Sequence, residues 1–358
     1  MSRHGAIFIA GHRLQNQRVT RPGPRSPENL VAWMGAVQAQ EYGPAKWGLA
    51  LRSPPGISDS AIERAIDAGR ILRTHLLRPT WHFVANTDIR WMLELTGPIV
   101  HRRMLTYDRQ LGLDAGVMTR ATGVIERALG DHRSLTRREL GAHLVQAGLP
   151  GTSRELAHIA MYAELEGVIC SGPRRGKQFT YALLADRAPD APRLPRDEAL
   201  AELTRRYYRS HGPASIRDFV WWSGLRTTDA KRGLEMNRAR SLEVDGITYW
   251  SIGRAAGMNG RDSSVHLLPV YDEYLVAYRD HHAVPRPPYV FGSFQHALVI
   301  GGQVAGGWRT IVGAKGLGVE VTPLRQFTAA ERRALSRAVE RYGQYLDVPI
   351  TLSTKFSP

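Results

Sequence analysis

The fold is best predicted from the stretch Val168-Ile169-Cys170-Ser171-Gly172-Pro173-Arg174-Arg175-Gly176-Lys177-Gln178-Phe179-Thr180-Tyr181-Ala182-Leu183. Two short apolar segments, each typical of a strand, enclose a basic tip that contains two glycines. Two helices are predicted before it. Thr136-Arg137-Arg138-Glu139 fits a capping box at the start of the first, and the second runs from Ser153 to about Glu166. Two helices followed by a hairpin are the order of a winged-helix unit, here over residues 131–186.

The same order occurs on both sides of this unit. In the N-terminal part, a turn or helix around Leu14–Val19 precedes a helix that Ser26 caps and Pro27 opens. A helix over Ser58–Ala68 and a strand pair over Ile71–Val84 follow. In the C-terminal direction, helices 197–210, 215–222 and 227–237 precede strands near 241–244 and 248–252. The repetition predicts three tandem winged-helix units, over residues 1–85, 131–186 and 187–262, with a helical connector over 86–130.

After about Ser263 the pattern changes to short strands separated by glycine, near 265–268, 290–292, 297–300 and 303–310. A final amphipathic helix is predicted over Thr328–Leu346. We therefore expect an α+β protein whose three winged-helix units are followed by a C-terminal domain, residues 263–358, that is a small β-barrel or an α+β fold.

Charge and cysteine content narrow the function. The 358 residues carry a formal net charge of +15, which favours a polyanionic partner such as nucleic acid. The single cysteine, Cys170, excludes an internal disulfide framework and a multi-cysteine zinc site. No apolar run approaches the ~20 residues of a membrane span, and Ala6–Ala10 is too short for a secretory signal. We expect a soluble cytoplasmic monomer that uses neither a metal nor a cofactor.

Two glutamines, Gln38 and Gln40, stand at the end of the helix predicted from Ser26, whose apolar positions extend to Val37. On a continuous helix, residues i and i+2 face opposite ways. Both amides can address one target only if the helix unwinds near Gln38, which Gly43-Pro44 shortly afterwards favours. The alternative is a pair of solvated glutamines at a helix end.

Four stretches together resemble one family, the AlkZ/YcaQ family of bacterial DNA glycosylases. They are Gln38-Ala39-Gln40, Leu76-Leu77-Arg78-Pro79-Thr80-Trp81-His82, Leu267-Leu268-Pro269-Val270-Tyr271-Asp272-Glu273-Tyr274-Leu275 and Gly302-Gln303-Val304-Ala305-Gly306-Gly307-Trp308-Arg309. The first matches the Gln-Φ-Gln motif of the AlkZ type. The resemblance implies tandem winged helices, a C-terminal β-barrel and hydrolysis of the N-glycosidic bond of N7-alkylated purines in double-stranded DNA. It also implies unhooking of interstrand crosslinks, with Gln38 and Gln40 holding the attacking water.

The chemistry of an amide agrees with such a substrate. A carboxamide is too weak a base to deprotonate water, but it can fix the position of a water molecule. Fixing the water is enough only where the leaving group needs little help. Alkylation at N7 puts a positive charge on the purine, which then leaves as a neutral base. We therefore expect a monofunctional glycosylase that cleaves cationic N7-alkylpurines and spares undamaged bases.

The segment Leu76–Val84 supplies further candidates. In a strand, Arg78, Thr80 and His82 share one face, so we expect them to border the active cleft, with Arg78 on a phosphate and His82 as a polar or phosphate-binding group. Pro79 indicates an edge or a bulge. The alternatives are that His82 caps a turn and that Arg78 pairs with a surface carboxylate.

Asp272 and Tyr274 are secondary candidates, because acidic groups in so basic a chain could orient arginines or bind water near the sugar. The alternative is an ion pair of the acidic group with Arg279 or Arg309. The adjacent His281 and His282 cannot readily share one metal, and a loop is predicted there.

DNA contacts are predicted first at the basic tip, which is expected to act as a wing, and then at three further cations. The residues are Arg174, Arg175 and Lys177, followed by Arg102, Arg103 and Lys46. Each could instead be an ordinary solvated surface charge. Two other functions stay open: a non-catalytic winged-helix DNA-binding protein, such as a transcription regulator in which Gln38 and Gln40 read adenine edges, and an enzyme acting on another polyanion such as tRNA.

Overall fold

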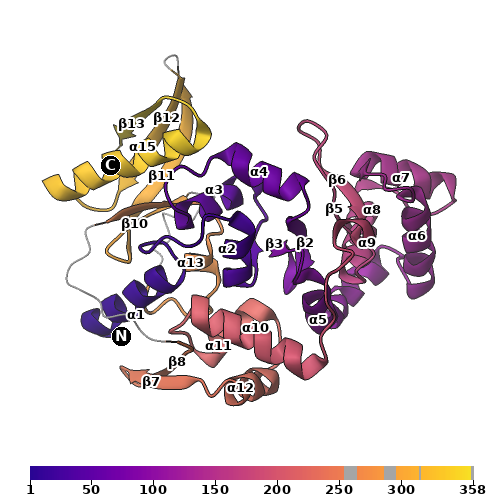
Figure 1. Cartoon of the computed structure of the whole chain (residues 1–358), viewed down its shortest axis with the longest axis horizontal. Helices are drawn as coiled ribbons and strands as arrows, with labels where there is room; N and C mark the ends of the chain where they lie inside the picture. The colour runs from indigo at the N-terminus through magenta and orange to yellow at the C-terminus, as the bar shows by residue number, and fades with distance from the viewer. Residues whose placement is uncertain (254–263, 286–295, 314–315, 356–358) are drawn as a thin grey trace.

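The structure is a computed structural model that describes residues 1–253, 264–285, 296–313 and 316–355. Helices and strands are mixed along the whole chain, which confirms the α+β class. Figure 1 shows the N-terminal elements in the middle of the molecule, between the C-terminal sheet on one side and the elements of residues 135–187 on the other. The strand predicted near 290–292 lies outside the described residues.

The N-terminal part forms four helices and a three-stranded sheet of order β1-β3-β2. The elements are α1 (Arg3–Asn16), α2 (Pro27–Met34), β1 (Val37–Gln38), α3 (Tyr42–Arg52), α4 (Asp59–Asp67), β2 (Ile71–Leu76) and β3 (Arg78–Ala85). The start of α2 is confirmed, since the Ser26 hydroxyl accepts a hydrogen bond from the Asn29 N–H at 3.3 Å and Pro27 takes the first position.

The turn or helix predicted around Leu14–Val19 is present as the last turn of α1 and the turn after it, although α1 begins much earlier, at Arg3. Two other predictions in this part are wrong. Helix α2 ends at Met34 and does not continue to Val37, because Gly35 adopts φ 82°, a conformation that glycine alone adopts readily. Gly43-Pro44 lies in the first turn of the unpredicted helix α3, where a proline is tolerated.

The next part begins with two helices, α5 (Ile89–Gln110) and α6 (Ala115–Ala128), so the region predicted as a connector is helical, as expected. It continues with β4 (Leu135–Thr136), α7 (Arg137–Gln146), α8 (Ser153–Leu165), β5 (Ile169–Ser171), β6 (Thr180–Leu183) and α9 (Leu184–Arg187). The capping box is confirmed: the Thr136 hydroxyl accepts from the Glu139 N–H, and the Glu139 carboxylate accepts from the Thr136 N–H at 2.7 Å. The strands form a sheet of order β4-β6-β5, with the basic tip between β5 and β6.

The predicted helices and strands of residues 187–252 are also present. They are α10 (Arg196–Ser210), α11 (Ile216–Ser223), α12 (Thr227–Met236), β7 (Arg240–Val244) and β8 (Ile247–Ser251). The strands β7 and β8 pair as an antiparallel hairpin.

The C-terminal part is a five-stranded sheet of order β13-β12-β11-β10-β9 with one long helix. Its elements are β9 (Val265–Leu268), α13 (Glu273–Val276), β10 (His296–Ile300), β11 (Gln303–Gly313), β12 (Gly316–Pro323), α15 (Ala329–Leu346) and β13 (Ile350–Thr354). Helix α15 confirms the final helix, with Thr328 as its cap. The described strands leave β13 and β9 as two edges, so the barrel is not confirmed, and the number of winged-helix units also stays a prediction.

Three hydrophobic cores hold these parts together. One core joins α1–α4 to the C-terminal sheet, and in it the Trp47 indole N–H donates to the Leu267 carbonyl at 2.7 Å. A second core joins the other side of β2 and β3 to α5, α10 and α11, and includes Val84 and Trp222. The third lies within α6–α8 and their strands. The sheet β1-β3-β2 therefore lies between two cores, and the face that carries Val84 points toward α10 and α11.

Candidate active site

Neither glutamine lies on a helix, because Gln38 ends strand β1 and Gln40 lies at a bend two residues later. Gln38 is paired with His82 across β1 and β3, and the Ala39 N–H donates to the Trp81 carbonyl at 2.7 Å, which continues the ladder. The register therefore places the Gln38 side chain on the face of His82, whereas Gln40 lies at a bend beyond this pairing.

The Gln38 side chain is buried and fixed in orientation. Its Oε1 accepts a hydrogen bond from Arg78 Nη2 at 2.8 Å, and its backbone N–H donates to Glu273 Oε1 at 2.6 Å. A carbonyl oxygen has two lone pairs, so Oε1 can accept a second hydrogen bond. Arg78 is itself buried, which lowers the pKa of its guanidinium, and it points at Gln38 instead of lying open to a phosphate.

Gln40 is half-buried, and its surroundings are held by an arginine that the sequence did not single out. The Gln40 Oε1 accepts from the Trp81 N–H at 3.4 Å. Arg73 Nε donates to the Ala39 carbonyl at 3.0 Å, and Arg73 Nη2 donates to the Gln40 carbonyl at 3.4 Å. The Arg73 guanidinium also lies 4.2 Å from the centre of the Trp81 ring. Arg73 therefore fixes the backbone between the two glutamines.

His82 and Thr80 add polar atoms to the same face. His82 is fully buried, and its Nδ1 donates to the Thr80 carbonyl at 2.9 Å, because a carbonyl can only accept. Burial, and then the charge of Arg78, lower the pKa of His82 to about 3, so the ring is neutral. Among the described residues, His82 Nε2 and the Thr80 hydroxyl are buried without a hydrogen-bond partner.

Glu273 is a buried residue of the candidate site that the sequence did not single out. Its Oε2 accepts from the Trp222 indole N–H at 3.0 Å and lies 3.3 Å from His211 Nε2. Burial alone would raise the pKa of Glu273, but the hydrogen bond and charge of His211 and the charge of Arg78 lower it to about 2. It is thus a buried carboxylate directly beneath Gln38. The acidic pair in the Leu267–Leu275 stretch was its only signal in the sequence.

Asp272 and Tyr274 have structural partners. The Asp272 carboxylate forms a bidentate ion pair with Arg52 at 2.7 and 2.8 Å and caps α13. The Tyr274 hydroxyl donates to the Gly302 carbonyl at 2.8 Å. The expected ion pair exists, but its partner is Arg52, whereas Arg309 pairs with Glu320.

The predicted DNA contacts differ in how open they are. The Lys46 ammonium is buried between Asp59 and Glu63, at 2.9 and 2.5 Å, so the structure does not support a phosphate contact there. The other five cations lie at or near the surface. Three of them have partners: Arg174 lies 3.4 Å from Glu63, Arg175 pairs with Glu139 at 2.8 Å, and Arg103 donates to the Gly224 carbonyl at 3.2 Å. The side chains of Lys177 and Arg102 are exposed. DNA binding by these side chains stays a prediction.

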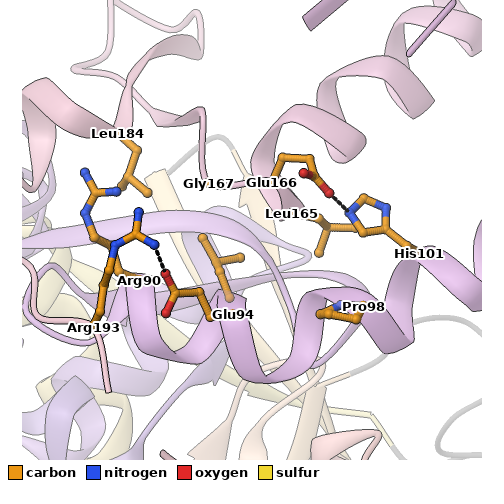
Figure 2. Close-up of a pocket in the computed structure, with 10 residues that line it drawn as sticks. Arg90, Glu94, Pro98, His101, Leu165, Glu166, Gly167, Leu184 and Arg193 are labelled. Carbon is orange, nitrogen blue, oxygen red and sulfur yellow. Dashed lines mark ion pairs between the residues drawn. The ribbon is translucent and has the colours of Figure 1, made fainter. Parts of the chain in front are cut away.

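A pocket of about 360 Å³ lies elsewhere, between α5, the turn after α8 and the segment before α10 (Figure 2). Figure 2 shows two ion pairs at this pocket, Arg193–Glu94 at 2.7 Å and His101–Glu166 at 2.8 Å. None of the predicted site residues lines it. Because most of its charges are paired with each other, we do not assign the active site to this pocket.

In the described part of the chain, no group of three or more histidine, cysteine, aspartate or glutamate side chains could hold a metal ion. No described helix has both the length and the apolar surface that crossing a bilayer requires.

Residues 31–345 match the family model for the DNA glycosylase AlkZ-like proteins. The chain therefore belongs to the AlkZ-like family of DNA glycosylases, which confirms the resemblance seen in the sequence.

Two comparisons with individual proteins agree with this assignment. The chain is 24% identical over 279 residues to the interstrand DNA cross-link repair glycosylase of Streptomyces sahachiroi, covering 74% of this chain and 75% of that protein. It is also similar to the solved structure of the Streptomyces sahachiroi DNA glycosylase AlkZ, with a TM-score of 0.80 and 19% identity, over 99% of this chain and all of the other. At this identity the structural likeness shows a shared fold.

Proposed function

We propose that the protein hydrolyses the N-glycosidic bond of N7-alkylated purines in double-stranded DNA, and that Gln38 and Gln40 position the attacking water. The observation that supports this most directly is the polar face between β1 and β3, where Gln38 lies across from His82 and its amide is tied to Arg78 at 2.8 Å. The Gln38 amide is therefore held in a fixed orientation on this face, and Gln40 follows two residues further along the chain.

The polar atoms on this face suit a water molecule. Buried polar atoms nearly always have hydrogen-bond partners, and a water between Gln38 and β3 would satisfy His82 Nε2 and the Thr80 hydroxyl. Neither an amide nor an imidazole with a pKa of about 3 can take a proton from water efficiently at neutral pH. Positioning of the attacking water is then the main contribution of the site to catalysis. This contribution is sufficient only if the leaving group is already cationic, as an N7-alkylpurine is.

The same site favours a monofunctional enzyme. The residues that pair with or bond to Gln38 are His82, Arg78 and Glu273, and none of them is a lysine that could form a Schiff base with the sugar. We extend the substrates to interstrand crosslinks, because the curated relative is named for crosslink repair. We further propose that the protein acts as a monomer and that Lys177, Arg175 and Arg102 bind DNA.

The test is release of N7-methylguanine from a defined duplex, measured as alkali-labile abasic sites. Wild type should release the base, and Gln38→Ala and Gln40→Ala should each slow release by roughly a hundredfold, because misplaced reactants lose about this much rate. Gln146→Ala, an exposed glutamine on α7, is the matched control and should match wild type. Variants as fast as wild type would remove the glutamines from the mechanism. Binding without release by the wild type would favour the non-catalytic DNA-binding alternative.

A further inference from the structure

Helix α11 carries two adjacent tryptophans in opposite environments. Trp222 is fully buried and donates to Glu273. Trp221 is 44% exposed, although tryptophan is highly buried on average. A large aromatic face at the surface needs an explanation, and its neighbours suggest one.

The Trp221 ring is held in place beside the candidate catalytic amide. Its indole N–H donates to the Val276 carbonyl at 3.0 Å. Its backbone carbonyl accepts from Arg78 Nη1 at 3.4 Å, and the Nη2 of the same guanidinium holds Gln38 Oε1 at 2.8 Å. One arginine therefore links Trp221 to Gln38, so the ring position is fixed relative to the amide.

Cations flank the exposed ring. The guanidinium carbons of Arg78 and Arg279 lie 5.8 and 5.4 Å from the ring centre. Arg279 is exposed and makes no ion pair within the described residues. An aromatic face next to a free guanidinium is the combination that binds an unstacked nucleotide, with the base on the ring and the phosphate on the cation.

The depth of Gln38 gives an independent reason for an unstacked nucleotide. Gln38 is only 8% exposed. A sugar that remains within a base-paired duplex cannot readily reach an amide below the protein surface, so the nucleotide must leave the stack. Its base then needs a new stacking partner near Gln38, and Trp221 is the exposed aromatic ring linked to that site.

We propose that Trp221 stacks on the base of the nucleotide that leaves the duplex, with Arg279 on an adjacent phosphate. This inference rests on the proposed function, because it assigns the ring a role toward the nucleotide that reaches Gln38. It concerns binding of the base and requires no contribution of Trp221 to the chemical step.

The test uses a duplex with a single bulged 2-aminopurine, a base whose fluorescence falls when it stacks, and the fully paired duplex as reference. Wild type should bind the bulge about tenfold more tightly than the paired duplex and quench its fluorescence, in line with the usual strength of base–aromatic stacking. Trp221→Phe should keep most of both effects. Trp221→Leu should lose both while its affinity for the paired duplex stays within about twofold.

Phe8→Leu, at an exposed aromatic on α1, is the control and should behave as wild type. Thermal unfolding of each variant shows that it is folded. The proposal would be overturned if Trp221→Leu quenched the fluorescence and preferred the bulge as strongly as the wild type, or if the wild type showed no preference for the bulge. Release of N7-methylguanine separates the proposed function from the proposed role of Trp221. If the wild type prefers the bulge but does not release the base, only the proposed function is refuted. If it releases the base but shows no preference for the bulge, only the role of Trp221 is refuted.

Discussion

Arg78 shows how a buried cation can serve a neutral amide. The sequence predicts that it contacts a phosphate, but the structure buries it and directs it at Gln38 Oε1. A guanidinium presents rigid, planar donors, so one group can hold the Gln38 amide and the Trp221 carbonyl in the same plane. Arg78 would then contribute to catalysis by holding the Gln38 amide in place, and it would affect DNA affinity only indirectly.

The variant Arg78→Lys separates these two roles. It keeps the charge but loses the planar fork, so the Gln38 amide should move and the single-turnover rate of N7-methylguanine release should fall by roughly tenfold to a hundredfold. The DNA dissociation constant, measured by fluorescence anisotropy, should change little. Arg196→Met, at an exposed arginine on α10, is a control expected to leave both values unchanged. Weaker binding with an unchanged rate would instead identify Arg78 as a phosphate contact.

The lowered pKa of His82 predicts that the stability of the folded protein depends on pH. Its pKa is about 3 in the folded protein and about 6.5 when unfolded. Above pH 6.5 both states are neutral, and as the pH falls below 6.5 the unfolded state takes up a proton that the folded state does not, so stability is lost down to about pH 3. Each pH unit in this window costs about 1.4 kcal/mol.

Urea denaturation at pH 7 and pH 5 measures this loss. His82→Asn should lose about 2 kcal/mol less than wild type between these pH values, because the asparagine does not titrate. His4→Asn, at an exposed histidine, should lose as much as wild type. The same loss in His82→Asn and wild type would show that His82 is not held neutral.

At the scale of elements, the sequence predicts those whose signals are local. Ser26-Pro27 and Thr136-Glu139 mark helix starts through caps that involve residues only three apart, and both are confirmed. Strand β1 could not be predicted in this way, since it has two residues and exists through pairing with His82 and Phe83. The link from Gln38 to Glu273 spans 235 residues, so no local pattern could reveal it.

A variant of Glu273 tests how β1 is held against α11 and α13. Both of its oxygens accept hydrogen bonds, from the Gln38 N–H and the Trp222 indole N–H. Glu273→Gln replaces one acceptor with an amide donor, so a buried donor loses its partner and the free energy of unfolding should fall by about 2 kcal/mol. Base release should slow as well, because the backbone of Gln38 is released. Glu126→Gln, at an exposed glutamate on α6, should change neither value. Unchanged stability and rate in Glu273→Gln would contradict this role.

At the scale of the whole molecule, the candidate site lies where separate parts of the chain meet. The strands β1 and β3 carry Gln38 and His82, α11 supplies Trp221 and Trp222, and α13 supplies Glu273. Figure 1 shows β3 and α13 in the middle of the molecule and α11 below them, with the basic tip between β5 and β6 pointing toward the top of the view. A net charge of +15 supplies the general attraction for DNA, while the candidate site holds the neutral side chains of Gln38 and His82 beside the buried Arg78 and Glu273. Recognition of damage would then depend on the charge of the leaving base.

The most direct test is therefore to compare two lesions in the same duplex context, cationic N7-methylguanine and neutral 8-oxoguanine, by the single-turnover rate of base release. If two amides position water without accepting its proton, wild type should release N7-methylguanine and leave 8-oxoguanine and undamaged guanine in place. Release of 8-oxoguanine or guanine at a comparable rate would contradict this account, because a neutral purine leaves only with the help of an acid or a base that the glutamine pair does not provide.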